Sequence, residues 1–250
     1  MPQALRGARG SRAERAVESA ADPRNLIWVM PAEEGVSERV VVVVSGGEAL
    51  NPQVALAVPA GAPVVAADSG LDSALALGLD VTVAIGDFDS ASPEAVAAAE
   101  TSGVRIDRHP AEKDATDLEL ALDAAVSMTP DRILVLAGRG GRLDHELSAL
   151  LLLASERYSA MHVDALVDDA RVYVIRGERE LAGWPGELLT LVAVNGPAVG
   201  VTTNGLEYPL RGETLEPGSS RGVSNVFEGD AARVTVETGV LLAIRPGESA

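Results

Sequence analysis

Two aspartates separated by one residue, Asp87 and Asp89, stand in the segment AIGDFDS, directly after the apolar run LDVTVAI. Side chains alternate between the faces of a strand, so these two point the same way if the extended geometry continues past Ile85. Two carboxylates aimed at one point repel each other, but they suit a hard cation with oxygen ligands. Gly-Asp and Asp-Ser are also common in solvated turns. The segment alone therefore leaves a metal site and a plain turn both open.

A second acidic cluster lies in EKDATDLELAL, where Asp114 and Asp117 stand at the expected start of a helix. Thr116 and Glu119 match a capping box there, and an acid at a helix N-terminus is favourable without any ligand. Lys113, however, is the only lysine among the 20 lysine and arginine residues of the chain. A compact ammonium group suits contact with a phosphate, so the cluster favours an anionic ligand.

A glycine-rich loop, GRGGRLDHEL, follows the apolar run RILVLA and opens a helix. Glycines let a backbone approach a phosphate closely, exposed N–H groups at a helix start favour anions, and Arg139 and Arg142 add charge. The loop matches neither the Walker A pattern nor the dinucleotide GxGxxG pattern. It is therefore a phosphate-loop candidate of its own type.

The elements that must position these motifs are four apolar runs, VVVVSGG, APVVAADSG, VTVAIGDFD and RILVLAGRGG, each ending in polar or glycine residues. Helical segments are expected between and after them, near 71–78, 92–102, 116–127 and 144–157. This alternation predicts an α/β fold with an open, mostly parallel sheet and flanking helices. Ligands bind beyond the carboxyl ends of the strands in such sheets, which is where the motifs fall.

The chain beyond about residue 169 changes character. Short β-branched runs, RVYVIRG, ELLTLVAV, AVGVTTNG, EYPLRG and ARVTVETGVLLAI, are broken by Gly, Pro and Asn, which predicts a C-terminal antiparallel β-sandwich domain. We therefore expect a flexible extension at 1–37, an α/β catalytic domain at 38–175 and the β-sandwich at 176–250.

Composition limits the partners. A net charge of −17 argues against nucleic acid, although a divalent metal can join protein carboxylates to a nucleotide. The absence of cysteine excludes disulfides and cysteine zinc sites. The apolar runs are too short to span a membrane, and no secretory signal is visible, so a cytoplasmic protein is expected.

The motifs AADSG, IGDFDS, KDATDLELAL, GRGGRLDH, TTNGLEYPL and GVSN occur in this order from about Val40 to Ile244. Together they resemble the thiamine pyrophosphokinase (thiamine diphosphokinase) family. The resemblance implies an α/β domain, a thiamine-binding β-sandwich and a homodimer with active sites at the interface. It implies Mg²⁺-dependent transfer of the pyrophosphoryl group of ATP to the hydroxyl of thiamine, giving thiamine diphosphate and AMP.

Site roles follow from the same resemblance. Asp87 and Asp89 would hold Mg²⁺, with Asp117 a further ligand or a neighbour of one, and Lys113 would act in catalysis. Which of the paired aspartates accepts the hydroxyl proton is left open. The residues implied to contact ATP are Asp68, Asp114, Thr116, Gly140, Gly141, Arg142 and Asp144, and those implied to contact thiamine are Ser224 and Asn225.

Three positions depart from the family pattern: Ser69 and Ala149 replace a glycine and an asparagine, and Val226 replaces a glutamate after Ser-Asn. Val226 lies on the acceptor side, where Trp184, Tyr208 and Phe227 are the aromatic candidates for a cationic thiazolium. The alternatives are a related pyrophosphokinase acting on another small alcohol, such as a pterin, and a non-catalytic nucleotide-binding regulator. The complete set Asp87, Asp89 and Asp117 argues against the regulator.

Overall fold

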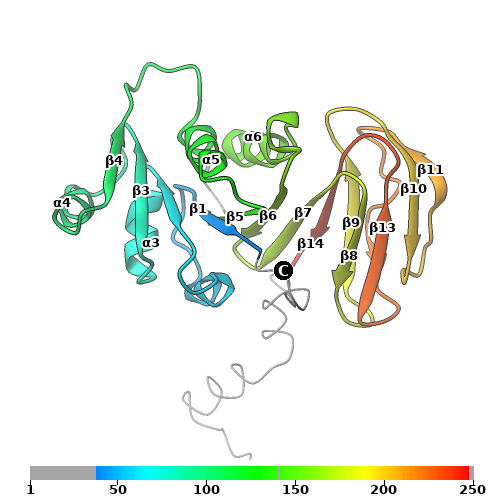
Figure 1. The fold of residues 1–250 in the computed structure, drawn as a ribbon. Helices are drawn as coiled ribbons and strands as arrows, with labels where there is room; N and C mark the ends of the chain where they lie inside the picture. The colour runs from blue at the N-terminus through cyan, green and yellow to red at the C-terminus, as the bar shows by residue number, and fades with distance from the viewer. Residues whose placement is uncertain (1–37, 140, 248–250) are drawn as a thin grey trace, which may run out of the picture.

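A computed structural model describes residues 38–139 and 141–247, so the expected extension at 1–37 and Gly140 lie outside it. Its strands form a ten-stranded sheet, in the order β12-β9-β14-β7-β6-β5-β1-β2-β3-β4, and a four-stranded sheet, β11-β10-β13-β8 (Figure 1). The first elements are β1 (Val40–Val44), η1 (Pro52–Ala57), β2 (Val64–Ala67), α3 (Gly70–Ala76), β3 (Val81–Gly86), α4 (Pro93–Thr101), β4 (Arg105–Arg108), α5 (Asp117–Ser127), β5 (Arg132–Ala137), α6 (Leu143–Leu153), η2 (Glu156–Tyr158) and β6 (His162–Val167). The antiparallel strands are β7 (Ala170–Ile175), β8 (Glu178–Ala182), β9 (Leu188–Ala193), β10 (Ala198–Asn204), β11 (Arg211–Leu215), β12 (Asn225–Val226), β13 (Ala231–Thr235) and β14 (Leu241–Arg245).

The predicted parallel sheet is confirmed, because β4, β3, β2, β1, β5 and β6 are parallel neighbours in that order. Alternate residues of β1 enter two cores: Val41 and Val43 pack with α5 and α6, whereas Val42 and Val44 pack with α3 and α4. Burial on both faces explains the unbroken apolar run. The sequence pattern missed β4, a polar edge strand, and β6, whose apolar run is interrupted by the buried Asp164.

The predicted C-terminal sandwich is also confirmed. Strands β7, β14, β9 and β12 extend the large sheet in antiparallel pairing, and the four-stranded sheet packs against them through one shared core. The expected division at 175/176 falls between β7 and β8, which belong to different sheets. The run ARVTVETGVLLAI forms two strands, β13 and β14, because the chain turns between them to reach the other sheet.

The sheet order sets the position of the motifs. Ala67 of β2 pairs with Ile85 of β3, so Asp68 and Gly86 follow directly on neighbouring strand ends. Helix α5 packs across β1, β2 and β3, which places its first residue, Asp117, at the same edge. No helix within the described ranges is long and apolar enough to cross a membrane. The cytoplasmic location stays a prediction.

Candidate active site

Three carboxylates, those of Asp68, Asp87 and Asp89, meet where β2 and β3 end, with one oxygen from each within 4.8 Å of the others. The strand ends at Gly86, before the two aspartates, and Phe88 between them has a φ of +60°, so the extended geometry does not continue through the pair. A turn brings the pair together instead: Asp87 Oδ1 accepts a hydrogen bond from the backbone N–H of Asp89 at 3.2 Å. The side chains converge as predicted, but through a turn rather than through strand alternation.

The electrostatics of this cluster favour a cation. The backbone N–H of Asp89 is the main cause that lowers the pKa of Asp87, and the negative charge of Asp87 is the main cause that raises the pKa of Asp89. Asp68 is only 8% exposed, and its Oδ1 is buried without a hydrogen-bond partner among the residues that the structure describes. An unsatisfied buried oxygen is costly, and a bound cation would satisfy it. A donor set made only of carboxylate oxygens fits Mg²⁺.

Lys113 and Asp117 border the cluster. The Lys113 Nζ lies 3.3 Å from Asp87 Oδ2 and 3.0 Å from Asp117 Oδ1. Desolvation acts to lower the pKa of Lys113, but Asp117 and Asp87 outweigh it and raise the pKa. The absence of a side chain at Gly86 leaves room for Asp68 and Asp117, because a Cβ there would lie 3.1 Å from Asp117 Oδ1 and 3.2 Å from the Cβ of Asp68. Asp117 thus stands beside the three clustered carboxylates, paired with the lysine.

Replacing this lysine tests whether a point charge is required. Lys113→Arg is expected to lower kcat/KM about tenfold, because a planar guanidinium cannot sit between Asp87 and Asp117 as a compact ammonium does. Steady-state kinetics with ATP as the varied substrate measures the effect. Wild-type kinetics in this variant would leave Lys113 with only a structural role, as the ion-pair partner of Asp87 and Asp117.

The predicted nucleotide residues on α5 have mixed surroundings. The Thr116 hydroxyl accepts a hydrogen bond from the backbone N–H of Glu119 at 3.2 Å, so it caps the helix as the capping-box interpretation predicts. Glu119 itself pairs with Arg157. Asp114 is exposed at the same sheet edge. Their contacts with ATP stay predictions.

In the described part of the glycine loop, the charged side chains form ion pairs and differ in their exposure. Gly141 is exposed with a φ of +88°. Arg142 and Asp144 form an ion pair of 2.6 Å at the start of α6, with side chains 70% and 63% exposed. Arg139 donates to Asp169 Oδ1 at 3.0 Å and to a carbonyl after β14, so it anchors the loop although its side chain is 38% exposed. Of the two predicted phosphate-binding arginines, Arg142 is the more exposed.

Comparison with known proteins follows the same division of the chain. The family model for the thiamin pyrophosphokinase catalytic domain matches residues 60–164, and the model for the thiamin pyrophosphokinase vitamin B1 binding domain matches residues 173–241. The chain belongs to the thiamine pyrophosphokinase family. Thiamine pyrophosphokinase of Bacillus subtilis is 27% identical over 72% of this chain and 86% of its own. The solved structure from that species has a TM-score of 0.75 at 23% identity, covering 84% of this chain and 100% of the other. The Geobacillus thermodenitrificans thiamin pyrophosphokinase structure has a TM-score of 0.72 at 27% identity, covering 84% and 99%.

One departure from the family pattern has a local explanation. Ser69 directly precedes α3, and its Oγ would lie 2.7 Å from a Cβ placed at Gly46. A glycine in the loop after β1 therefore makes room for the hydroxyl that this chain carries in place of the family's glycine. Sequence reasoning missed the role of this loop beside the site, although the Ser-Gly-Gly segment after five valines was a signal for it.

In the predicted thiamine-binding half, the Asn225 side chain joins its own strand to the backbone at Tyr208. Its Oδ1 accepts hydrogen bonds from the N–H groups of Tyr208 and Val226 at 3.0 and 2.9 Å, and its Nδ2 donates to the Tyr208 carbonyl at 2.8 Å. Ser224, with a φ of +57°, is exposed. Asn225 thus fixes the position of Tyr208, whereas Ser224 is exposed.

The three aromatic candidates differ in availability. The Arg245 guanidinium lies 5.0 Å from the ring centre of Trp184 and 5.9 Å from that of Phe227. Both rings therefore already have a cation of the protein as their partner. Tyr208 is 54% exposed. Among the three, Tyr208 is the ring open to a ligand.

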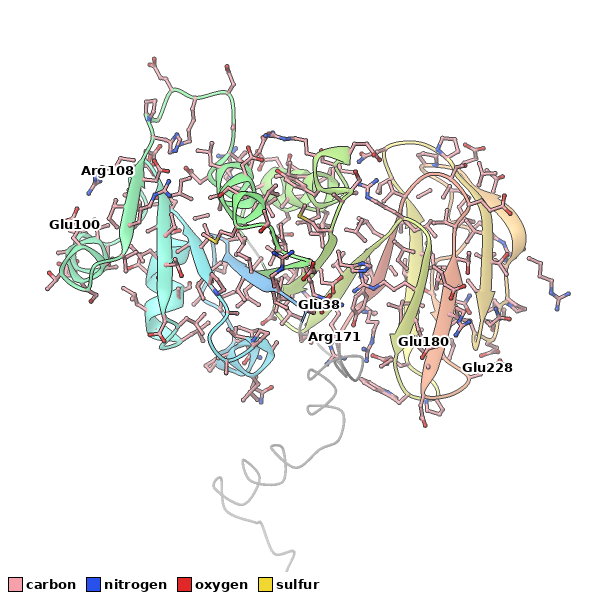
Figure 2. The ribbon with its side chains drawn as sticks, in the orientation of Figure 1. Glu38, Glu100, Arg108, Arg171, Glu180 and Glu228 are labelled. Atoms are coloured by element: carbon pink, nitrogen blue, oxygen red, sulfur yellow. The ribbon has the colours of Figure 1, made fainter. Side chains whose placement is uncertain are left out.

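The two halves of the predicted site do not meet within one chain. A hollow of about 660 Å³ is lined by residues 202–207 and 209–212 and by Glu228. Arg108, whose guanidinium lies 5.2 Å from the Phe88 ring, marks the turn that carries Asp87 and Asp89. Figure 2 shows Arg108 and Glu228 at opposite ends of the molecule. The hollow therefore lies away from the carboxylate cluster of the same chain.

Proposed function

We propose that the chain transfers the pyrophosphoryl group of ATP to the hydroxyl of thiamine, giving thiamine diphosphate and AMP, with Mg²⁺ as cofactor. The observation that carries the proposal is the cluster of Asp68, Asp87 and Asp89, with its unsatisfied buried oxygen, in a chain of this family. Asp68 joins the proposed ligands Asp87 and Asp89, and Asp117 borders them.

The groups of the proposed site have separate roles in the transfer reaction. Bound Mg²⁺ supplies charge neutralisation on the triphosphate. The thiamine hydroxyl oxygen forms a bond to the β-phosphorus, the bond from that phosphorus to the oxygen of AMP breaks, and AMP leaves with the electron pair. The hydroxyl proton passes to one of the paired aspartates, Asp87 or Asp89. Lys113 offers a point charge to the phosphates, and Arg142 and Gly141 lie at the start of α6 to receive them.

The acceptor side suits a cation. Tyr208 and Ser224 are exposed there, and Glu207 and Glu228 line the neighbouring hollow. An aromatic face and nearby carboxylates both attract a positively charged ring. A thiazolium therefore fits this side better than a neutral pterin does, despite the change at Val226.

AMP formation from ATP and Mg²⁺, with and without thiamine, tests the proposal directly. Thiamine-dependent AMP, with thiamine diphosphate identified by mass, is the expected result. AMP formation that depends on a pterin but not on thiamine would establish the alternative pyrophosphokinase. Tight nucleotide binding without any acceptor-dependent product would establish the regulator.

We further propose a homodimer whose active sites combine the metal half of one chain with the acceptor half of the other. Two observations support it: the halves lie at opposite ends of one chain (Figure 2), and α6 carries an exposed apolar stripe. Leu143, Leu147 and Leu151, spaced four apart on one helix face, are 76%, 56% and 40% exposed. A stripe of this kind next to the phosphate loop indicates a protein contact.

Mixing two inactive variants tests the shared site. Asp89→Asn lacks the metal half, and Tyr208→Ala lacks the acceptor half. If sites are shared, refolding them together yields hybrid dimers with one site built from the two intact halves. We expect thiamine-dependent AMP formation to reappear in the mixture. A mixture no more active than its parents would place each site within a single chain.

Leu147→Glu tests the surface itself. A charge in the centre of the stripe is expected to convert the dimer to a monomer, because burying an unpaired carboxylate is costly. Light scattering after size-exclusion chromatography measures the mass. Ser148→Glu, on an exposed neighbouring position of α6, should leave the dimer intact. Equal effects of the two substitutions would contradict the assignment.

A further inference from the structure

One side-chain hydrogen bond joins the two turns that carry the clustered carboxylates. Asp68 stands in the turn between β2 and α3, and Asp87 and Asp89 stand in the turn between β3 and α4. The Ser90 hydroxyl, on the second turn, donates to Asp68 Oδ2 on the first. We propose that Ser90 is a positioning residue for the metal site, which aims the other oxygen of Asp68 at the Asp87–Asp89 pair. This inference rests on the Mg²⁺ role proposed above.

The backbone of Asp68 is already fixed, so only its carboxylate needs orientation. Its N–H donates to the Ile85 carbonyl at 2.9 Å, and its φ of +48° is a conformation that non-glycine residues rarely adopt. The side chain still has rotational freedom about χ1 and χ2. The Ser90 bond removes that freedom by fixing Oδ2, which leaves Oδ1 buried and without a partner beside the pair. Groups that orient a ligating side chain in this way govern metal affinity.

A second serine two residues further on provides the contrast. The Ser92 hydroxyl donates to Asp72 Oδ1, and its backbone N–H donates to Asp72 Oδ2 at 3.1 Å. The same Ser92 oxygen accepts from the Ala95 N–H at 3.2 Å, so it caps α4. Asp72 lies in the first turn of α3, outside the carboxylate cluster. Ser92 therefore braces the same turn without touching a proposed ligand.

The test measures Mn²⁺ binding to the full chain without nucleotide, with electron paramagnetic resonance counting the free ion. Ser90→Ala is expected to weaken Mn²⁺ binding by about 10–100-fold. Ser90→Thr, which keeps the hydroxyl, should restore most of the affinity. Ser92→Ala should lower the Tm by roughly 2–4 °C, because a helix cap is lost, while Mn²⁺ affinity stays at the wild-type value.

Three results would overturn the assignment. Wild-type Mn²⁺ affinity in Ser90→Ala would show that Asp68 needs no orientation from the hydroxyl. Equal losses in Ser90→Ala and Ser92→Ala would show that the turn acts only through its stability. A wild-type chain that binds no Mn²⁺ would also end the inference, and the AMP assay would then report separately whether the proposed reaction survives.

Discussion

Asp89→Asn is expected to lower kcat on the order of 10³-fold without lowering the Tm. The amide keeps the shape of the side chain but removes a charged oxygen from the group that it forms with Asp68 and Asp87. Asp89 is exposed, and the charge of Asp87 raises its pKa, so the fold gains nothing from its ionisation. Removing that charge relieves repulsion, and the metal-free Tm should stay the same or rise.

The measurements are the AMP assay and thermal unfolding in EDTA, with Asp107→Asn as the control. Asp107 lies on β4, the strand next to β3, and pairs with Arg105 at 3.0 Å, outside the cluster. It should retain activity close to that of the wild type. A comparable loss of kcat in both variants would mean that negative charge along the sheet edge matters in general, rather than a specific ligand set.

The parallel half of the fold was predictable because burial on both faces leaves a simple signature. The valines of β1 serve two cores, so the run is uniformly apolar and ends sharply in Ser-Gly-Gly. Strand β4 gave no such signal, because an edge strand carrying RIDR exposes its charged ends. In strand β6 the apolar pattern is interrupted by Asp164. This aspartate is buried because it forms ion pairs of 2.6 Å with both Arg132 and Arg179. Only tertiary structure supplies those partners.

The site was predictable as a set of motifs but not in its geometry. Asp87 and Asp89 were expected to converge, yet the turn at Phe88 does this, not the strand. The local pattern gave Asp68 no role as a metal ligand, because its place beside the pair depends on the pairing of β2 with β3. The sequence also could not show that Trp184 and Phe227 pack against a cation, because that cation, Arg245, comes from the distant strand β14.

That cation, Arg245, joins the large sheet to the acceptor region. Its side chain is 2% exposed, and its Nε donates to Glu187 Oε1 at 2.6 Å. It also donates to the Ala182 carbonyl at 2.9 Å and lies against Phe227, two residues after Asn225. Burial is the main cause that raises the pKa of Glu187, and Arg245 acts against that shift. The Glu187 carboxylate thus depends on Arg245 to remain charged inside the protein.

Arg245→Met is expected to lower the free energy of unfolding by about 3–5 kcal/mol, because it leaves the Glu187 carboxylate buried without its main partner. The pKa of Glu187 should then rise further above its unfolded value. A raised folded pKa means that the folded state binds more protons, so the variant loses stability as pH rises through that range. Urea unfolding should therefore show a smaller loss of unfolding free energy, relative to the wild type, at pH 5 than at pH 8.

Adding Glu187→Gln to this variant should recover part of the lost stability, because a neutral amide costs less to bury than a carboxylate. Strictly additive losses in the double variant would instead assign the effect to lost packing against Trp184 and Phe227.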